Sequence, residues 1–145
     1  MTTKEVRRLT VAGFIALAVL VVYWTLWYTA RDSVASAVQS DQTHAYYDFE
    51  NAFPLADAWL GVCVLLAVRG IRKGSPSALF WLLTGGGAGV YLFCMDVLYD
   101  LEHGIYATGA GGVIELGINL LTLGFSVWFL RWAWNRREAL LSSPG

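Results

Sequence analysis

The sequence predicts an all-α membrane protein built from four spanning helices, and three observations support this fold class. The 145-residue chain is 57% hydrophobic and only 14% charged, which is too little charge to cover the surface of a soluble domain of this size. Three runs without charge, 10–30, 78–95 and 116–130, approach the ~17–25 residues that cross a bilayer. Nine of the ten basic residues lie in three clusters between or beside the apolar runs.

A weaker fourth apolar run covers residues 52–68 and contains Asp57. If it did not span, the basic clusters on its two sides would fall on opposite faces of the membrane. We therefore expect one membrane domain over residues 1–145. Its spans should lie at about 10–30, 52–68, 78–99 and 113–130, with residues 31–51 as an interfacial segment between the first two.

The basic clusters also predict the orientation of the chain. A bundle of four spans places all three clusters on one side, and an excess of Lys and Arg marks the cytoplasmic side. Both termini should therefore be cytoplasmic, in a multi-pass protein of the cell membrane. The three clusters are Lys4, Arg7 and Arg8; Arg69, Arg72 and Lys73; and Arg131, Arg136 and Arg137.

The first apolar run has an alternative interpretation as a cleaved signal peptide, because Ala35-Ser36-Ala37 follows it. The run is longer than the usual apolar core of a signal peptide. It also ends in four aromatic residues that are typical of an interfacial belt. We therefore expect a retained helix, with the belt at Tyr23, Trp24, Trp27 and Tyr28.

Several function classes are poorly supported by the sequence. The net charge of −1 gives no basis for nucleic-acid binding. Cys63 and Cys94 both lie within predicted spans without a CxxC or Cys/His spacing, so a thiol relay or a structural zinc site is not expected. No Walker loop or nucleophile elbow is present either.

Polar residues, joined in the third span by two glycines, follow one face of each of the last two spans. Along the third span, successive members of this face lie 4, 7, 4 and 3 residues apart, and along the fourth they lie 4, 3 and 4 residues apart. At about 100° per residue, each set falls within a sector of roughly 60°. Such faces should point into the bundle, since lipid leaves polar groups unpaired. The two sets are Gly85, Gly89, Asp96, Asp100 and His103, and Glu115, Asn119, Thr122 and Ser126.

Three intramembrane carboxylates should meet at one depth. With a rise of 1.5 Å per residue, Asp57, Asp96 and Glu115 each lie roughly 3–6 Å below the outer end of their predicted spans. Only Arg31 offers a fixed positive charge nearby. Facing carboxylates without counter-charge cannot all stay ionised, so either some hold protons or a cation occupies the site. The alternative is that interfacial water solvates each acid separately.

The first functional interpretation is an outer pocket for a cation, a cationic amphiphile or a lipid head group, bound through charge and cation–π contacts. Acid/base chemistry on the ligand would use Asp96, Glu115 and His103. The expected binding residues are Asp57, Asp100, Asn119, Asp48, Glu50 and Tyr47.

Three other interpretations remain open. A divalent cation could bind Asp57, Asp96, Glu115 and His44, since oxygen ligands suit Ca²⁺ or Mg²⁺ and a histidine suits Zn²⁺, Mn²⁺ or Fe²⁺. Intramembrane acids could instead serve a small proton-coupled transporter that works as a homo-oligomer. The position of the acids near one face argues against this, because transporters bind near the midplane. The chain could also be a membrane partner subunit with no ligand.

Overall fold

The computed structural model describes residues 2–38 and 44–142, with side chains for all of these except 36–38, 44 and 45. The described residues form helices and turns without strands, which confirms the all-α prediction. The elements are α1 (Thr3–Val38), α2 (His44–Glu50), α3 (Pro54–Lys73), α4 (Ser77–Glu102), the 3₁₀ turn η1 (Ile105–Ala107), α5 (Ala110–Asn135) and α6 (Arg137–Leu141).

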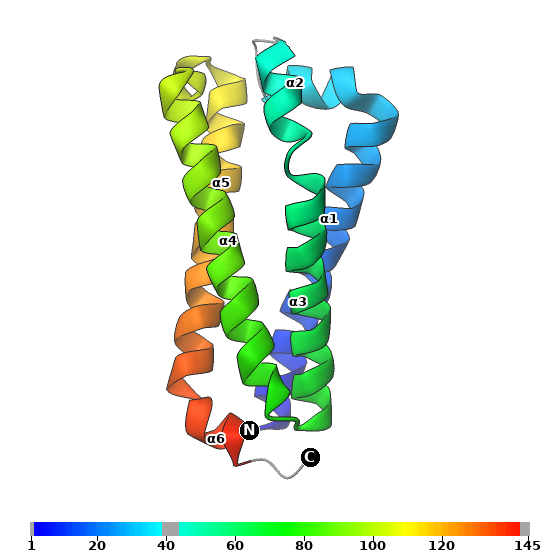
Figure 1. The fold of residues 1–145 in the computed structure, drawn as a ribbon, viewed down its shortest axis with the longest axis vertical. Helices are drawn as coiled ribbons and strands as arrows, with labels where there is room; N and C mark the ends of the chain where they lie inside the picture. The colour runs from blue at the N-terminus through cyan, green and yellow to red at the C-terminus, as the bar shows by residue number, and fades with distance from the viewer. Residues whose placement is uncertain (1, 39–43, 143–145) are drawn as a thin grey trace.

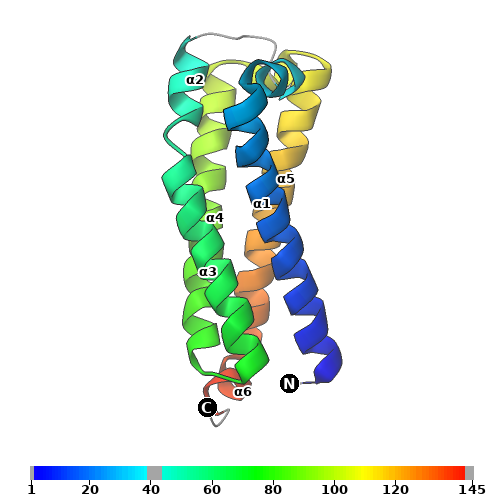
Figure 2. The ribbon, with the colours of Figure 1, turned by 90° about the vertical axis from the view of Figure 1, so that its right-hand side faces the viewer.

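Four helices are long and apolar enough to cross a membrane, and they stand side by side as one bundle (Figure 1 and Figure 2). This confirms a multi-pass membrane protein. The start of α1 and the whole of α6 lie at one end of the bundle, which we call the proximal end; the opposite end is the distal end (Figure 1). The candidate spans are Thr3–Ala35, Tyr46–Lys73, Ser77–Glu102 and Ala110–Asn135.

The segment expected at the interface is largely helical. α1 continues to Val38, and a break at Ala30 (φ −145°, ψ 41°) divides it into two parts. After this break the helix turns and runs across the distal end of the bundle (Figure 1). α2 then follows, and Pro54 begins α3 at a position where a missing N–H costs no helical hydrogen bond.

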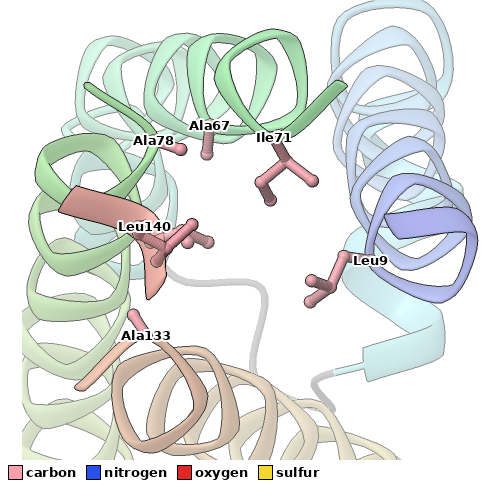
Figure 3. Packing of buried hydrophobic residues seen from close by; sticks show 7 residues of the cluster. Leu9, Ala67, Ile71, Ala78, Ala133 and Leu140 are labelled. Carbon is pink, nitrogen blue, oxygen red and sulfur yellow. The ribbon is translucent and has the colours of Figure 1, made fainter. Parts of the chain in front are cut away.

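A cluster of buried apolar side chains closes the proximal end. It joins α1, α3, α4, α5 and α6, and Figure 3 shows its members pointing toward one another. Ala78 and Ala133 are completely buried there, so the helices approach closely at this level. The cluster consists of Leu9, Ala67, Ile71, Ala78, Leu82, Ala133 and Leu140.

Glycines set the spacing of α4 from both of its neighbours. A Cβ on Gly85 would lie 3.0 Å from the Cβ of Cys63 on α3. A Cβ on Gly86 would lie 2.6 Å from Cγ of Leu130 on α5, and one on Gly89 would collide with Ser126. The predicted pair Gly85 and Gly89 therefore contacts two different helices. Gly86 and Gly89 form the close contact with α5.

The turn between α3 and α4 requires a glycine. Gly74 ends α3 in the left-handed conformation (φ 66°), which side chains disfavour. The amide of Ser75 donates to the carbonyl of Gly70 at 2.9 Å, and that of Gly74 donates to Ile71 at 3.2 Å. These two bonds satisfy carbonyls at the end of the helix and return the chain directly into α4.

Candidate functional site

A cavity of about 410 Å³ runs between the four spanning helices. Its volume lies within the ~300–1,000 Å³ that is typical of small-molecule sites. The proximal part of its lining is apolar and reaches as far as Leu9 and Ile71. The distal part contains four carboxylates, so one end of the cavity is acidic, and the rest is hydrophobic apart from Thr122 and Ser126. The acids are Glu50, Asp57, Asp96 and Glu115.

The four carboxylates come from four different elements. Asp57 lies in the first turn of α3, where the helix dipole favours a negative group. Asp96 precedes the end of α4 by six residues, about 9 Å at 1.5 Å per residue, and Glu115 follows the start of α5 by five residues, about 7.5 Å. Glu50 is the last residue of α2. The cavity thus brings together the three acids that the sequence placed at one depth, and adds Glu50.

Two of the acids are held by aromatic donors from α1. The hydroxyl of Tyr23 donates to Oε2 of Glu50 at 2.8 Å. The indole Nε1 of Trp24 donates to Oδ2 of Asp57 at 2.9 Å. Hydrogen bonds donated to a carboxylate orient the group as well as stabilise it, so Glu50 and Asp57 have defined positions at the distal end.

The other two acids are not engaged in this way. In residues 2–38 and 44–142, no side-chain hydrogen bond or ion pair involves Asp96 or Glu115, and both are half-buried. Their carboxyl groups line the cavity without a hydrogen-bond or ion-pair partner among the described residues. A ligand in the cavity could therefore bind them without first breaking a bond within the protein.

The nearest basic residue identified from the sequence, Arg31, is occupied elsewhere. Its guanidinium lies 5.4 Å from the ring centroid of Trp27 and 5.5 Å from that of Tyr47. It also donates to Oδ1 of Asn51 at 3.4 Å. Arg31 does not line the cavity, and neither does any other Lys, Arg or His among the described residues. The acids of the cavity therefore lack a counter-charge from the described part of the chain.

Asp100 and Asn119 form a separate polar cluster between α4 and α5. Asn119 is fully buried, and its Nδ2 donates to Oδ2 of Asp100 at 2.7 Å and to the hydroxyl of Tyr106 at 3.0 Å. Burial, followed by the neighbouring Asp100, raises the pKa of Tyr106 to about 12, so its hydroxyl stays neutral near pH 7. Neither Asp100 nor Asn119 lines the cavity, although both were expected to bind the ligand.

Of the remaining predicted residues, the three with described side chains do not line the cavity. His103 follows the end of α4, is exposed, and stacks on Tyr99 with ring centroids 4.0 Å apart. Asp48 is exposed on α2. The hydroxyl of Tyr47 donates to Oδ1 of Asp32 at 3.1 Å. His44 begins α2, but its side chain is outside the described part of the structure.

Sequence reasoning did not assign Tyr23 and Trp24 to the site. Both belong to the aromatic run at the end of the first span, which also predicts a membrane anchor. The signal that distinguishes a site residue from a membrane anchor is the polar hydrogen of each side chain, because a buried phenol or indole usually finds a hydrogen-bond acceptor. Counting acids within reach of these donors would have suggested Glu50 and Asp57 as their partners.

A metal site receives no geometric support. Among the residues that the structure describes, no group of three or more His, Cys, Asp or Glu side chains could hold a metal ion. The side chain of His44 is not part of that search. The four acids are therefore better treated as one end of a larger cavity than as a ligand set for one ion.

No protein-family model matches this chain, and no curated protein or solved structure matches it significantly. Its function is therefore inferred from the geometry of its own residues.

Proposed function

We propose that this protein binds a cationic amphiphile, with the positive head group at the acidic distal end of the cavity and the apolar part along the proximal lining. The supporting observation is that four carboxylates line one hydrophobic cavity that has no basic side chain in its described lining. We further propose that the distal end faces the outside of the cell membrane, as the basic clusters of the sequence predict.

Electrostatics favours a positive head group over a neutral or negative one. Like charges repel more strongly in a low-dielectric surrounding than in water. A bound cation would reduce the repulsion among Asp57, Asp96 and Glu115, whereas an anion would increase it. Tyr23 and Trp24 also line this end, and aromatic faces attract ammonium groups.

The apolar lining favours a ligand with a hydrocarbon part over a small free ion. Burying apolar surface is worth about 25 cal/mol per Å², so a ligand that fills the proximal part gains energy that an ion cannot. A small ion bound only by the acids would leave most of the cavity without a complementary group.

An equilibrium binding experiment tests this function. Purified protein in lipid nanodiscs is titrated with a long-chain alkyltrimethylammonium, whose charge does not depend on pH, and with a neutral amphiphile of equal chain length. We expect the ammonium compound to bind at least about tenfold more tightly, equivalent to ~1.4 kcal/mol. Asp96→Asn and Glu115→Gln should remove most of this preference.

The control variant is Glu102→Gln, because Glu102 is an exposed carboxylate at the same end of α4 and does not line the cavity. It should bind as wild type. Equal binding of charged and neutral compounds by the wild type would refute the proposed function. An effect of divalent cations that chelator removes would favour a metal site. A proton flux driven by the ammonium compound would favour the transporter.

A further inference from the structure

A cluster of buried side chains lies at each end of the cavity. At the proximal end the cavity reaches the apolar cluster around Leu9 and Ile71, whose side chains point into the space between the helices (Figure 3). At the distal end, Trp27 and Ala35 are fully buried and Tyr46 is 4% exposed, and these three residues pack together as a second cluster. The turned part of α1 and α2 thus cover the end at which the acids lie.

The side of the cavity is open along one pair of helices. Every strongly exposed lining residue belongs to α1 or α5, whereas the lining residues of α3 and α4 are buried or half-buried. α1 and α5 also contact one another least among the neighbouring spanning helices. We call these exposed lining residues the seam: Ile15 (55% exposed), Val19 (63%), Ile118 (38%), Leu121 (63%) and Phe125 (43%).

The spacing of the seam residues makes it a continuous line. Ile15 and Val19 are four residues apart, and Ile118, Leu121 and Phe125 follow at intervals of three and four. Both spacings keep the side chains on one face of their helix. Because these apolar side chains lie in the middle of candidate spans, the opening faces lipid tails and not water.

We propose that the seam is a lateral entrance through which a single-chain cationic amphiphile passes from the membrane into the cavity. This inference rests on the proposed function and narrows its ligand to a membrane-partitioned compound with one hydrocarbon tail. The tail can slide between α1 and α5 without contacting water, while the head group follows the distal side toward Glu115. The cavity of about 410 Å³ suits one such chain.

A water-soluble cation would have to take a different route. It would need to cross the buried aromatic cluster at the distal end or cross the apolar seam without its hydration shell. Removing an unpaired ion from water is costly. An amphiphile that already resides in the membrane with its tail dehydrated avoids this cost, and its head group needs only to move at the depth where the acids lie.

The test measures binding kinetics in nanodiscs with a fluorescent single-chain alkyltrimethylammonium. Val19→Trp and Leu121→Trp narrow the seam, and Val19→Ala and Leu121→Ala widen it. A gate changes the association and dissociation rates in the same direction, so we expect both rates to fall at least about fivefold in the Trp variants and both to rise in the Ala variants, with Kd changing by less than either rate.

The matched controls are Leu65→Trp on α3 and Leu98→Trp on α4. Both residues are exposed apolar positions in spans (49% and 58%), and neither lines the cavity. Their rates should equal those of wild type. If wild type binds the compound but all four seam variants keep its rates, the lateral entrance is refuted and the proposed function stands. If wild type does not bind it, both are refuted.

Discussion

The indole of Trp24 on α1 donates a 2.9 Å hydrogen bond to the carboxylate of Asp57 on α3. This bond joins the two helices at the acidic end of the cavity and fixes one acid beside the space that a head group would occupy. The two residues are 33 positions apart in the sequence. The bond connects the aromatic belt of the first span with the acid of the second span.

Removing this donor should destabilise the protein. Trp24→Phe leaves Asp57 without its bonded partner, and an unsatisfied buried polar group costs ~1–3 kcal/mol. We expect a lower midpoint of thermal unfolding in detergent. Trp134→Phe is the control, because Trp134 is 58% exposed. In the double variant with Asp57→Ala, which removes the acceptor, the two effects should not add; strict additivity would show that the bond contributes nothing.

Asn119 should be structural and separable from ligand binding. It is fully buried, and it bridges Asp100 and Tyr106 without lining the cavity. We expect Asn119→Ala to lower the free energy of unfolding by ~1–3 kcal/mol, with an unchanged Kd for the ammonium amphiphile. A variant that kept its stability but lost binding would place Asn119 in the site after all, as the sequence first predicted.

Two adjacent glycines of α4 should respond in opposite ways to alanine. At Gly86 a Cβ would lie 2.6 Å from Cγ of Leu130 and 3.2 Å from the carbonyl oxygen of Ser126, and such overpacking costs about 1–3 kcal/mol. At Gly87 a Cβ meets nothing within 4 Å, so alanine should be neutral or stabilise the helix by up to ~1 kcal/mol. Thermal unfolding of both variants measures the difference; equal effects would contradict the close packing of α4 on α5.

The orientation in the membrane can be tested by cysteine labelling in a background without Cys63 and Cys94. Ala107 is exposed in η1 at the distal end, and Ser142 is exposed after α6 at the proximal end. A membrane-impermeant thiol reagent applied to intact cells should modify Ala107→Cys and leave Ser142→Cys unmodified. The reverse pattern would overturn the cytoplasmic assignment of the termini.

The membrane fold followed from the sequence because its signals are local. Charge-free runs of sufficient length mark the spans, and even the span that contains Asp57 could be inferred from the placement of the basic clusters. The extent of α1 could not be inferred from the sequence, because the helix in residues 31–38 depends on packing. Ala35 is fully buried against Trp27 and Tyr46. No pattern in that polar stretch signals a second helical part.

The site was only partly predictable. The helical faces of the sequence grouped Asp96 with Glu115, and both line the cavity, since periodicity determines which way a residue points. Periodicity does not determine which neighbour each face meets. Asp100 and Asn119 share those same faces but bond to each other, and His103 stacks on Tyr99. Glu50 and its partner Tyr23 come together only because α2 folds over the distal end.

The most direct test of ligand position is photo-crosslinking with a long-chain trimethylammonium that carries a diazirine at the end of its tail. After illumination in nanodiscs, mass spectrometry locates the adducts. We expect them on cavity-lining residues of the proximal part, such as Val68 and Phe129, and we expect them to be lost in Asp96→Asn with Glu115→Gln. Adducts confined to exposed residues that do not line the cavity, such as Val62 and Leu98, would contradict a head group at the acids with the tail inside the bundle.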